Sequence, residues 1–183
     1  MKQLALILSI LSILVLTSCG GENPVENPEE NTEEVQLKGF EELDLTEYGF
    51  NLSVMVPEAE TNGEAQVNLT ERGALEIVVG DGFGLEIMFG EEGALELLKT
   101  DLAEDLVFKS EIIKEEENAL IYTQDIPDSG VKTQNHFFYK AAVGADIYEV
   151  RDIMEGEYGA SMIEKMLKAA RTIKSTSAVE VAA

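Results

Sequence analysis

The stretch "ALEIVVGDGFGLEIMF" (residues 74–89) decides the fold class of this 183-residue chain. Two runs in which apolar and polar residues alternate, 74–79 and 85–89, flank the glycine-rich segment 80–84. A period of two is that of a half-buried strand, and a short glycine-rich link between two such runs predicts an antiparallel hairpin. The residues expected on its inner face are Leu75, Ile77, Val79, Leu85, Ile87 and Phe89.

The same alternation recurs on both sides of this hairpin. Upstream, residues 50–56 alternate and end at Pro57, which predicts another half-buried strand. Downstream, charged or glycine-containing turns separate four more runs, at 106–113, 119–126, 132–142 and 146–154. Short turns between successive strands predict antiparallel pairing throughout.

Two segments have a helical period instead. In 91–106, leucines recur every three or four residues at Leu95, Leu98, Leu102 and Leu106. In 161–174, Ser161 stands three residues before Glu164, which predicts a capping box. The apolar stripe expected on this second helix is Ile163, Met166, Leu167, Ala170 and Ile173. The sequence therefore predicts an α+β domain, an antiparallel sheet of about six to eight strands with two helices packed on one face.

Two segments carry a resemblance to a known superfamily. The opening strand "LTEYGFNLSVMVPE" (45–58) and the closing "EYGASMIEKMLKAARTIKS" (157–175), with a central helix between them, resemble the Mog1/PsbP-like α/β/α sandwiches. In that superfamily a Gly-Phe strand ending near proline opens the domain, and a helix with an Ile-Lys-Ser-like end closes it. Members include photosystem extrinsic subunits, small GTPase-binding proteins and lipoproteins. The resemblance implies a single sandwich domain and assigns no functional residue.

Residues 1–19 have the pattern of an export signal. Lys2 precedes an apolar run at 4–16, which is shorter than the roughly 20 residues that a transmembrane helix needs. Leu16-Thr17-Ser18-Cys19 resembles the lipobox of bacterial lipoproteins. That resemblance implies that Cys19 carries a diacylglycerol, becomes the first residue after cleavage and receives a further acyl chain, such as palmitate, on its amine. The alternative is an ordinary signal peptide, with Cys19 discarded or left as an odd thiol.

The segment after the cysteine predicts a tether. Residues 20–35 repeat Glu-Asn-Pro and contain too little apolar surface to offset the entropy of ordering. We therefore expect a signal peptide at 1–18, a lipidated cysteine and acidic tether at 19–35, one domain at 36–175 and a frayed tail at 176–183. The acidic tether resembles the surface-export signals of some Gram-negative lipoproteins.

Location and partners follow from the signal and the charge. The anchor predicts the cell envelope, and Gly20 after the cysteine favours the outer membrane in a Gram-negative host, with surface exposure left open. The formal net charge of −23 repels phosphate backbones, so nucleic acid is not an expected partner. With a single cysteine, no intramolecular disulfide is expected.

Three motifs invite a chemical interpretation. The glycines of 80–84 lack the lysine and the following helix of a phosphate loop, which favours a hairpin turn. His136 is the only histidine, and "GAS" at 159–161 lacks the final glycine of a nucleophile elbow, so we expect His136 to be a packing or edge residue. Glu86, Glu91 and Glu92 lack EF-hand spacing, and no metal or cofactor is predicted.

Two groups of residues leave a surface role open. Phe137, Phe138, Tyr139 and Tyr148 form either an aromatic patch or part of the core. The closing helix concentrates basic residues that either contact anionic lipid or an acidic partner, or form an ordinary exposed face. These basic residues are Lys165, Lys168, Arg171 and Lys174.

The leading functional hypothesis is a lipid-anchored envelope protein with a non-enzymatic domain that binds or assembles an unknown protein partner. One alternative is a carboxylate-dependent hydrolase acting on envelope polysaccharide or peptide, because the chain is rich in carboxylates. The other is a calcium-stabilised surface or adhesion module.

Overall fold

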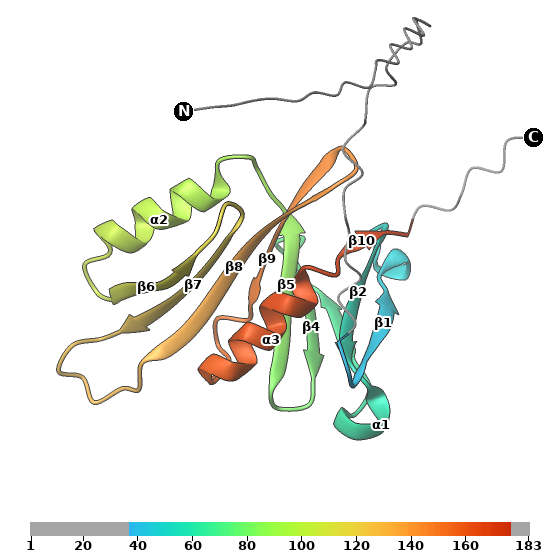
Figure 1. Ribbon diagram of the computed structural model, residues 1–183, viewed down its shortest axis with the longest axis horizontal. Helices are drawn as coiled ribbons and strands as arrows, with labels where there is room; N and C mark the ends of the chain where they lie inside the picture. Colours follow the sequence, from blue (N-terminus) through green and yellow to red (C-terminus); the bar gives the residue numbers. More distant parts are fainter. Residues whose placement is uncertain (1–36, 177–183) are drawn as a thin grey trace, which may run out of the picture. The chain divides into compact units, whose positions relative to one another are not determined.

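The computed structural model describes residues 37–176, which form two antiparallel sheets and two main helices (Figure 1). The predicted signal peptide, the lipobox ending at Cys19, the tether and residues 177–183 of the tail lie outside the described residues. The α+β prediction is confirmed, and the larger sheet has seven strands.

Strand order in the larger sheet is β3-β4-β5-β9-β8-β7-β6. Its strands are β3 (Gln66–Leu69), β4 (Leu75–Val79), β5 (Phe83–Phe89), β6 (Lys109–Glu115), β7 (Ala119–Asp125), β8 (Gln134–Val143) and β9 (Asp146–Asp152). The smaller sheet has the order β1-β2-β10, with β1 (Phe40–Asp44), β2 (Leu52–Pro57) and β10 (Lys174–Ser175). The main helices are α2 (Ala94–Glu104) and α3 (Ala160–Ala170), and the short ones are η1 (Thr46–Tyr48) and α1 (Ala59–Asn62).

The hairpin predicted from residues 74–89 is present as β4 and β5. Val79 pairs with Phe83 at its tip, and Gly80 there has a φ of 56°, a left-handed conformation that glycine adopts without strain. Phe89 is the exception on the expected inner face, because it is 62% exposed. It is the last residue of β5, and its ring packs against those of Phe50 and Tyr148, at centroid distances of 5.5 and 5.0 Å.

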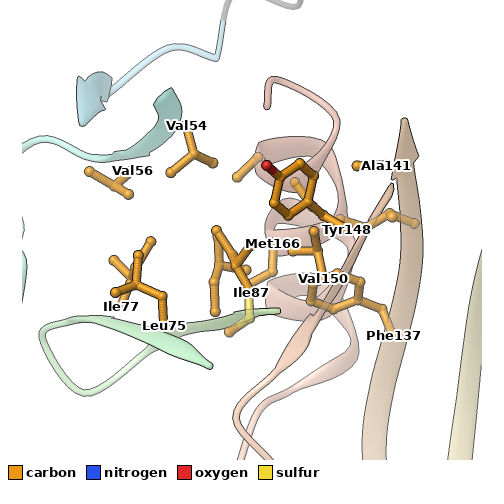
Figure 2. Close-up of a cluster of buried hydrophobic side chains, with 14 of the residues drawn as sticks. Val54, Val56, Leu75, Ile77, Ile87, Phe137, Ala141, Tyr148, Val150 and Met166 are labelled. Carbon is orange, nitrogen blue, oxygen red and sulfur yellow. The ribbon is translucent and has the colours of Figure 1, made fainter. Parts of the chain in front are cut away.

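The main core lies between α3, the small sheet and one face of the large sheet (Figure 2). α3 contributes Ile163 and Met166, both fully buried, as its apolar stripe predicts. Val54 and Val56 enter from β2, and Phe137 enters from β8. This one core joins both sheets, so residues 37–176 behave as a single packing unit.

A second, smaller core lies on the other face of the large sheet. It contains Leu95 of α2 with Leu120, Tyr122 and Phe138. Neighbouring residues of a strand point to opposite faces, and Phe137 belongs to the main core while Phe138 belongs to the second. The two helices therefore cover opposite faces of the sheet, and the expectation that both pack on one face is wrong. The sequence of β8 contains the sign of this arrangement, because apolar residues at successive positions of a strand indicate that both of its faces are buried.

α2 is shorter than the predicted helix. It begins at Ala94, after Glu91 and Glu92, and ends at Glu104. Asp105 stops it by accepting the backbone N–H groups of Val107 and Phe108, at 2.7 and 2.8 Å. Leu106 is consequently outside the helix and completely exposed, which corrects its expected place in the apolar stripe.

α3 also begins and ends earlier than predicted. Gly159 is its N-cap, without a side-chain hydrogen bond, and Ser161 lies inside the helix. The predicted capping box is therefore wrong. At the other end, Ile173 follows the helix and Lys174 belongs to β10.

Strand β2 is buried on both sides, whereas half-burial was expected. Its polar side includes Ser53, which is enclosed because its Oγ donates to Glu42 Oε1 of β1 at 2.6 Å. The alternation at 50–56 concerns β2 alone and does not indicate a neighbouring strand. β1 was not predicted, because its sequence "FEELD" has too few apolar residues to indicate a strand. The short strands β3 and β10 were likewise not predicted.

Candidate functional site

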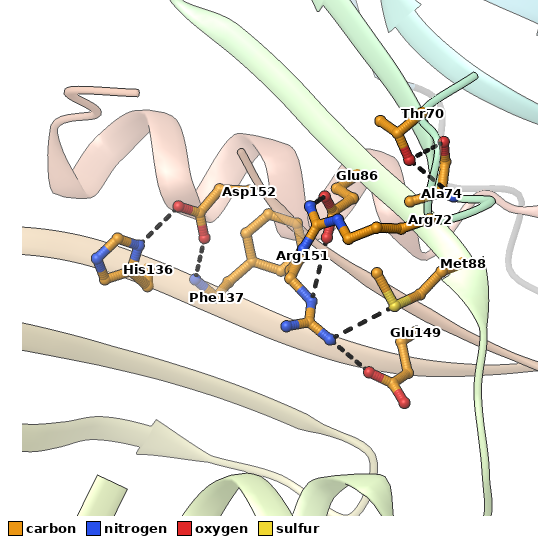
Figure 3. Close-up of polar contacts among 10 residues, drawn as sticks. All are labelled: Thr70, Arg72, Ala74, Glu86, Met88, His136, Phe137, Glu149, Arg151 and Asp152. Carbon is orange, nitrogen blue, oxygen red and sulfur yellow. Dashed lines mark hydrogen bonds and ion pairs between the residues drawn. The ribbon is translucent and has the colours of Figure 1, made fainter. Parts of the chain in front are cut away.

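The only histidine of the chain forms a buried pair with an aspartate. His136 Nδ1 lies 2.7 Å from Asp152 Oδ2, and both side chains have no exposed surface (Figure 3). The other carboxylate oxygen, Oδ1, accepts the backbone N–H of Phe137 at 2.8 Å. His136 is thus a packing residue, as expected, but it is not at an edge, because β8 lies between β7 and β9.

The end of β9 explains why an aspartate stands at position 152. Asp152 is its last residue, and the β8–β9 register ends at Phe138 opposite Arg151, so β9 provides no further carbonyl to Phe137. A buried N–H without an acceptor is costly, and the Asp152 carboxylate replaces the missing strand partner. The pair therefore has a clear structural purpose at the point where the sheet loses a strand.

The second nitrogen of the histidine has no partner among the described residues. His136 Nε2 is buried without a hydrogen bond, and the ring lies 5.3 Å from that of Tyr122, centroid to centroid. Burial raises the pKa of Tyr122 to about 12, with the nearby Asp152 carboxylate adding to the effect. The pair resembles an acid–imidazole dyad in its contacts, but solvent and substrate have no access to it.

A second carboxylate is enclosed by arginines on the face that carries α2. Glu86 of β5 accepts Arg72 Nη2 at 3.1 Å and lies 3.8 Å from Arg151 Nε (Figure 3). Arg151 also donates to Glu149 and lies 5.8 Å from the centre of the Phe138 ring. Two arginines therefore already surround the Glu86 carboxylate.

The other two glutamates of that calcium hypothesis lie in the β5–α2 connection. Glu91 is exposed there, and Glu92 Oε1 accepts Lys140 Nζ at 2.5 Å. Among the described residues, no three histidine, cysteine, aspartate or glutamate side chains gather in a group that would hold a metal ion.

A pocket of about 510 Å³ opens at the start of β8. Its walls come from the β7–β8 loop and from the segment that leads into α3, and they include Lys132, Asn135, Glu157 and Tyr158. Asn135 Nδ2 donates to the Tyr158 carbonyl at 3.0 Å, which joins the two walls. Burial raises the pKa of Tyr158, as do the Asp152 and Glu155 carboxylates. This lining is mixed in polarity and includes a single carboxylate.

Two glycines hold the Tyr158 ring in place. A Cβ atom added to Gly84 would collide with the Tyr158 hydroxyl, and one added to Gly156 would collide with the ring itself. The ring therefore packs directly on backbone at both positions. Gly84 stands opposite Val78 in the hairpin, so the last glycine of the segment 80–84 serves close packing, whereas a phosphate loop would use it to approach a ligand.

The four basic residues of the closing segment separate into two pairs. Lys165 and Lys168 lie on the exposed side of α3. Arg171 donates to Glu116, which follows β6, and Lys174 Nζ lies 3.1 Å from Glu42 of β1. Lys165 and Lys168 therefore form no ion pair with the described residues. Arg171 and Lys174, which were predicted to belong to the same partner surface, instead bind carboxylates of the domain itself.

The aromatic residues around β8 belong mostly to the interior. Phe137, Phe138 and Tyr148 are buried, and Tyr139 is partly buried against the main core. The core interpretation is therefore confirmed for these side chains. Beside them, the Phe89 ring at the end of β5 is exposed.

Sequence reasoning did not identify Asp152, Arg151 or Tyr158. The sequence contained a signal for Asp152. An aspartate inside the apolar run 146–154 needs a partner when it is buried, and His136 is the single histidine of the chain. The arginine and the tyrosine carried no such signal, because Arg151 meets Glu86 and Tyr158 meets Gly84, both on strand β5, which is distant in sequence.

Comparisons with known proteins find no relative of this chain. No family model matches the chain, and searches of curated proteins and of solved structures return no significant match. Within residues 37–176, no helix is both long and apolar enough to cross a membrane.

Proposed function

We propose that this protein is a lipid-anchored protein of the cell envelope whose domain binds or assembles a protein partner and performs no catalysis. The anchor rests on the Leu16-Thr17-Ser18-Cys19 pattern after a short apolar run. Two or three acyl chains on one cysteine would hold the protein durably on a bilayer. In a Gram-negative host, the outer membrane is the proposed location.

The observation that carries the binding role is the exposed pair Lys165 and Lys168 on α3. The chain has 13 basic residues against 36 acidic ones, and no ion pair among the described residues neutralises these two neighbouring lysines. They lie one helical turn apart and opposite the buried stripe, on a rigid element. This arrangement suits a protein partner with an acidic patch.

The placement of the titratable residues supports binding over hydrolysis. His136 and Asp152 have no exposed surface, and Glu86 is held between two arginines. A carboxylate-dependent hydrolase needs two carboxyl groups facing one another across a cleft. The pocket at β8 has Glu157 alone.

The anchor is tested by labelling the full chain in a bacterial host with a fatty-acid analogue. Wild type should incorporate the label and sediment with membranes, and Cys19→Ala should do neither. An unlabelled wild-type protein would remove the anchor from the proposal without affecting the binding role of the domain.

The binding role is tested by proximity crosslinking in the native host, with captured proteins identified by mass spectrometry. The double variant K165E/K168E should lose a partner that wild type captures. A matched control, K38E/K132E, changes the net charge equally at two exposed lysines elsewhere and should retain it. Equal capture by both double variants would exclude the α3 lysines as the binding surface.

A further inference from the structure

One edge of the large sheet concentrates exposed apolar side chains. Ile112 and Ile113 of β6 are 43% and 57% exposed, and Val107, just before the strand, is 61% exposed. Leu106 beside it is completely exposed, although Asp105 holds this turn in a defined conformation. We call this surface, residues 106–115, the β6 edge. These four exposed apolar residues lie within eight positions of one another on ordered backbone, and exposed apolar surface of this kind is typical of an interaction site.

The backbone of the β6 edge is also available for pairing. Within residues 37–176, β6 pairs only with β7, and it is the terminal strand of the sheet. A terminal strand presents a row of N–H and C=O groups that can accept another strand. A partner that adds a strand here would satisfy these groups and cover the isoleucines together.

The sequence of β6 is complementary to itself. It reads "KSEIIKE", with two isoleucines between oppositely charged neighbours, Glu111 and Lys114. The β6–β7 register shifts between Ile112 and Lys114, so Ile113 is skipped in that pairing. With the same shift on the free edge, an antiparallel pair of β6 strands centred on Ile112 would place Glu111 of each copy opposite Lys114 of the other.

The side chains of Glu111 and Lys114 lie on the same face of β6, as this arrangement requires. Glu111 pairs with Thr123 of β7, and Lys114 pairs with Ile121, two residues away. Both side chains therefore lie on the same face of the sheet, as charges that meet across two strands must. Ile112 stands opposite Tyr122, on the other face, where the two copies of Ile112 would contact each other.

We infer that two copies of this chain associate through their β6 edges, in antiparallel register centred on Ile112, to form one continuous sheet. The local charge pattern matters because two molecules of net charge −23 repel one another. Lys114 contacts Glu116 Oε1 of its own chain at 2.8 Å and is more than half exposed, so it would also meet Glu111 of the other copy and supply attraction there. The opposite edge, β3, reads "QVNL" and offers no charged pair.

A single engineered cysteine tests the register. Cβ atoms of directly opposed residues lie about 5 Å apart, close to the separation that a disulfide spans. Under mild oxidation, the full chain with Ile112→Cys should form disulfide-linked dimers. Leu69→Cys, at an exposed position of β3, is the matched control, and the chain with Cys19 alone is the blank. Equal crosslinking at positions 112 and 69, or none at 112, would overturn the inference.

Sedimentation of the full chain in detergent gives an independent test. Wild type should show a concentration-dependent monomer–dimer equilibrium, and Ile112→Lys should be monomeric over the same range. Leu69→Lys places the same charge on the other edge and should behave as wild type. Circular dichroism shows whether each variant is folded. A wild-type protein that stays monomeric at its highest soluble concentration would refute the dimer.

Discussion

His136 Nδ1 and Asp152 Oδ2 lie 2.7 Å apart, and the same carboxylate accepts the Phe137 backbone N–H through Oδ1. One side chain thus satisfies two groups of β8 where β9 ends. Because all three groups are buried, the free energy of the folded state depends on this carboxylate more than on any surface charge.

Asp152→Ala should therefore be strongly destabilising. It leaves the Phe137 N–H and His136 Nδ1 without their acceptor, which should cost about 3 kcal/mol or more in the free energy of unfolding. Asp152→Asn keeps one acceptor oxygen and should cost less. Urea unfolding measures both, with the exposed Asp101→Ala expected within about 0.5 kcal/mol of wild type. If the alanine variants at 152 and 101 unfold alike, the structural role of the pair is wrong.

Tyr122 should titrate later than the other tyrosines. Burial raises its pKa in the folded state to about 12, above the value of about 10 in an unfolded chain. Its contribution to stability is therefore complete below about pH 10 and is lost as the pH rises towards 12. Phenolate absorbance followed against pH should show a late component that Tyr122→Phe removes. A titration curve that the substitution leaves unchanged would contradict this assignment.

Gly84→Ala should destabilise the domain through Tyr158. The new Cβ collides with the Tyr158 hydroxyl and lies 3.1 Å from Ile153 Cδ1, so we expect a loss of about 1–3 kcal/mol. In a Tyr158→Ala background the main collision is absent, and the same substitution should cost clearly less. Thermal unfolding of the four proteins in this double-mutant cycle measures the coupling. Additive effects would show that the two residues do not interact.

Truncation of two leucines of the predicted apolar stripe should change stability by very different amounts. Leu95→Ala removes a buried side chain from the second core and should cost about 2–5 kcal/mol. Leu106→Ala changes a completely exposed side chain and should leave stability within about 0.5 kcal/mol of wild type. Chemical unfolding separates the two, and a large loss at position 106 would mean that α2 continues beyond Glu104.

The regular period of the central strands and of α3 allowed the fold class, the hairpin and most of the core to be predicted. Prediction failed at the helix ends, where a single residue overrode the pattern. Asp105 ended α2 before Leu106, and Gly159 began α3 before Ser161. It also failed at β1, which is recognisable as a strand only through its pairing with β2.

The candidate site was less predictable, for a physical reason. The contact between Glu86 of β5 and Arg151 of β9 depends on strand order, because these two strands are neighbours in the sheet. Much of the chain separates β5 from β9, so the sequence does not indicate that they pair. Local alternation shows which residues are buried, but it does not show which strands are neighbours.

The position of the last two elements has a consequence for how the domain folds. α3 packs on β2, β5, β8 and β9, and β10 pairs with β2, so the main core joins residues near both ends of the described region. Such distant contacts form only after large loops have closed, which slows folding. The domain should accordingly remain without its main core until α3 has been synthesised. A domain that lacks its main core while it is being made has not yet folded, which is the state that the proposed export of this chain would require.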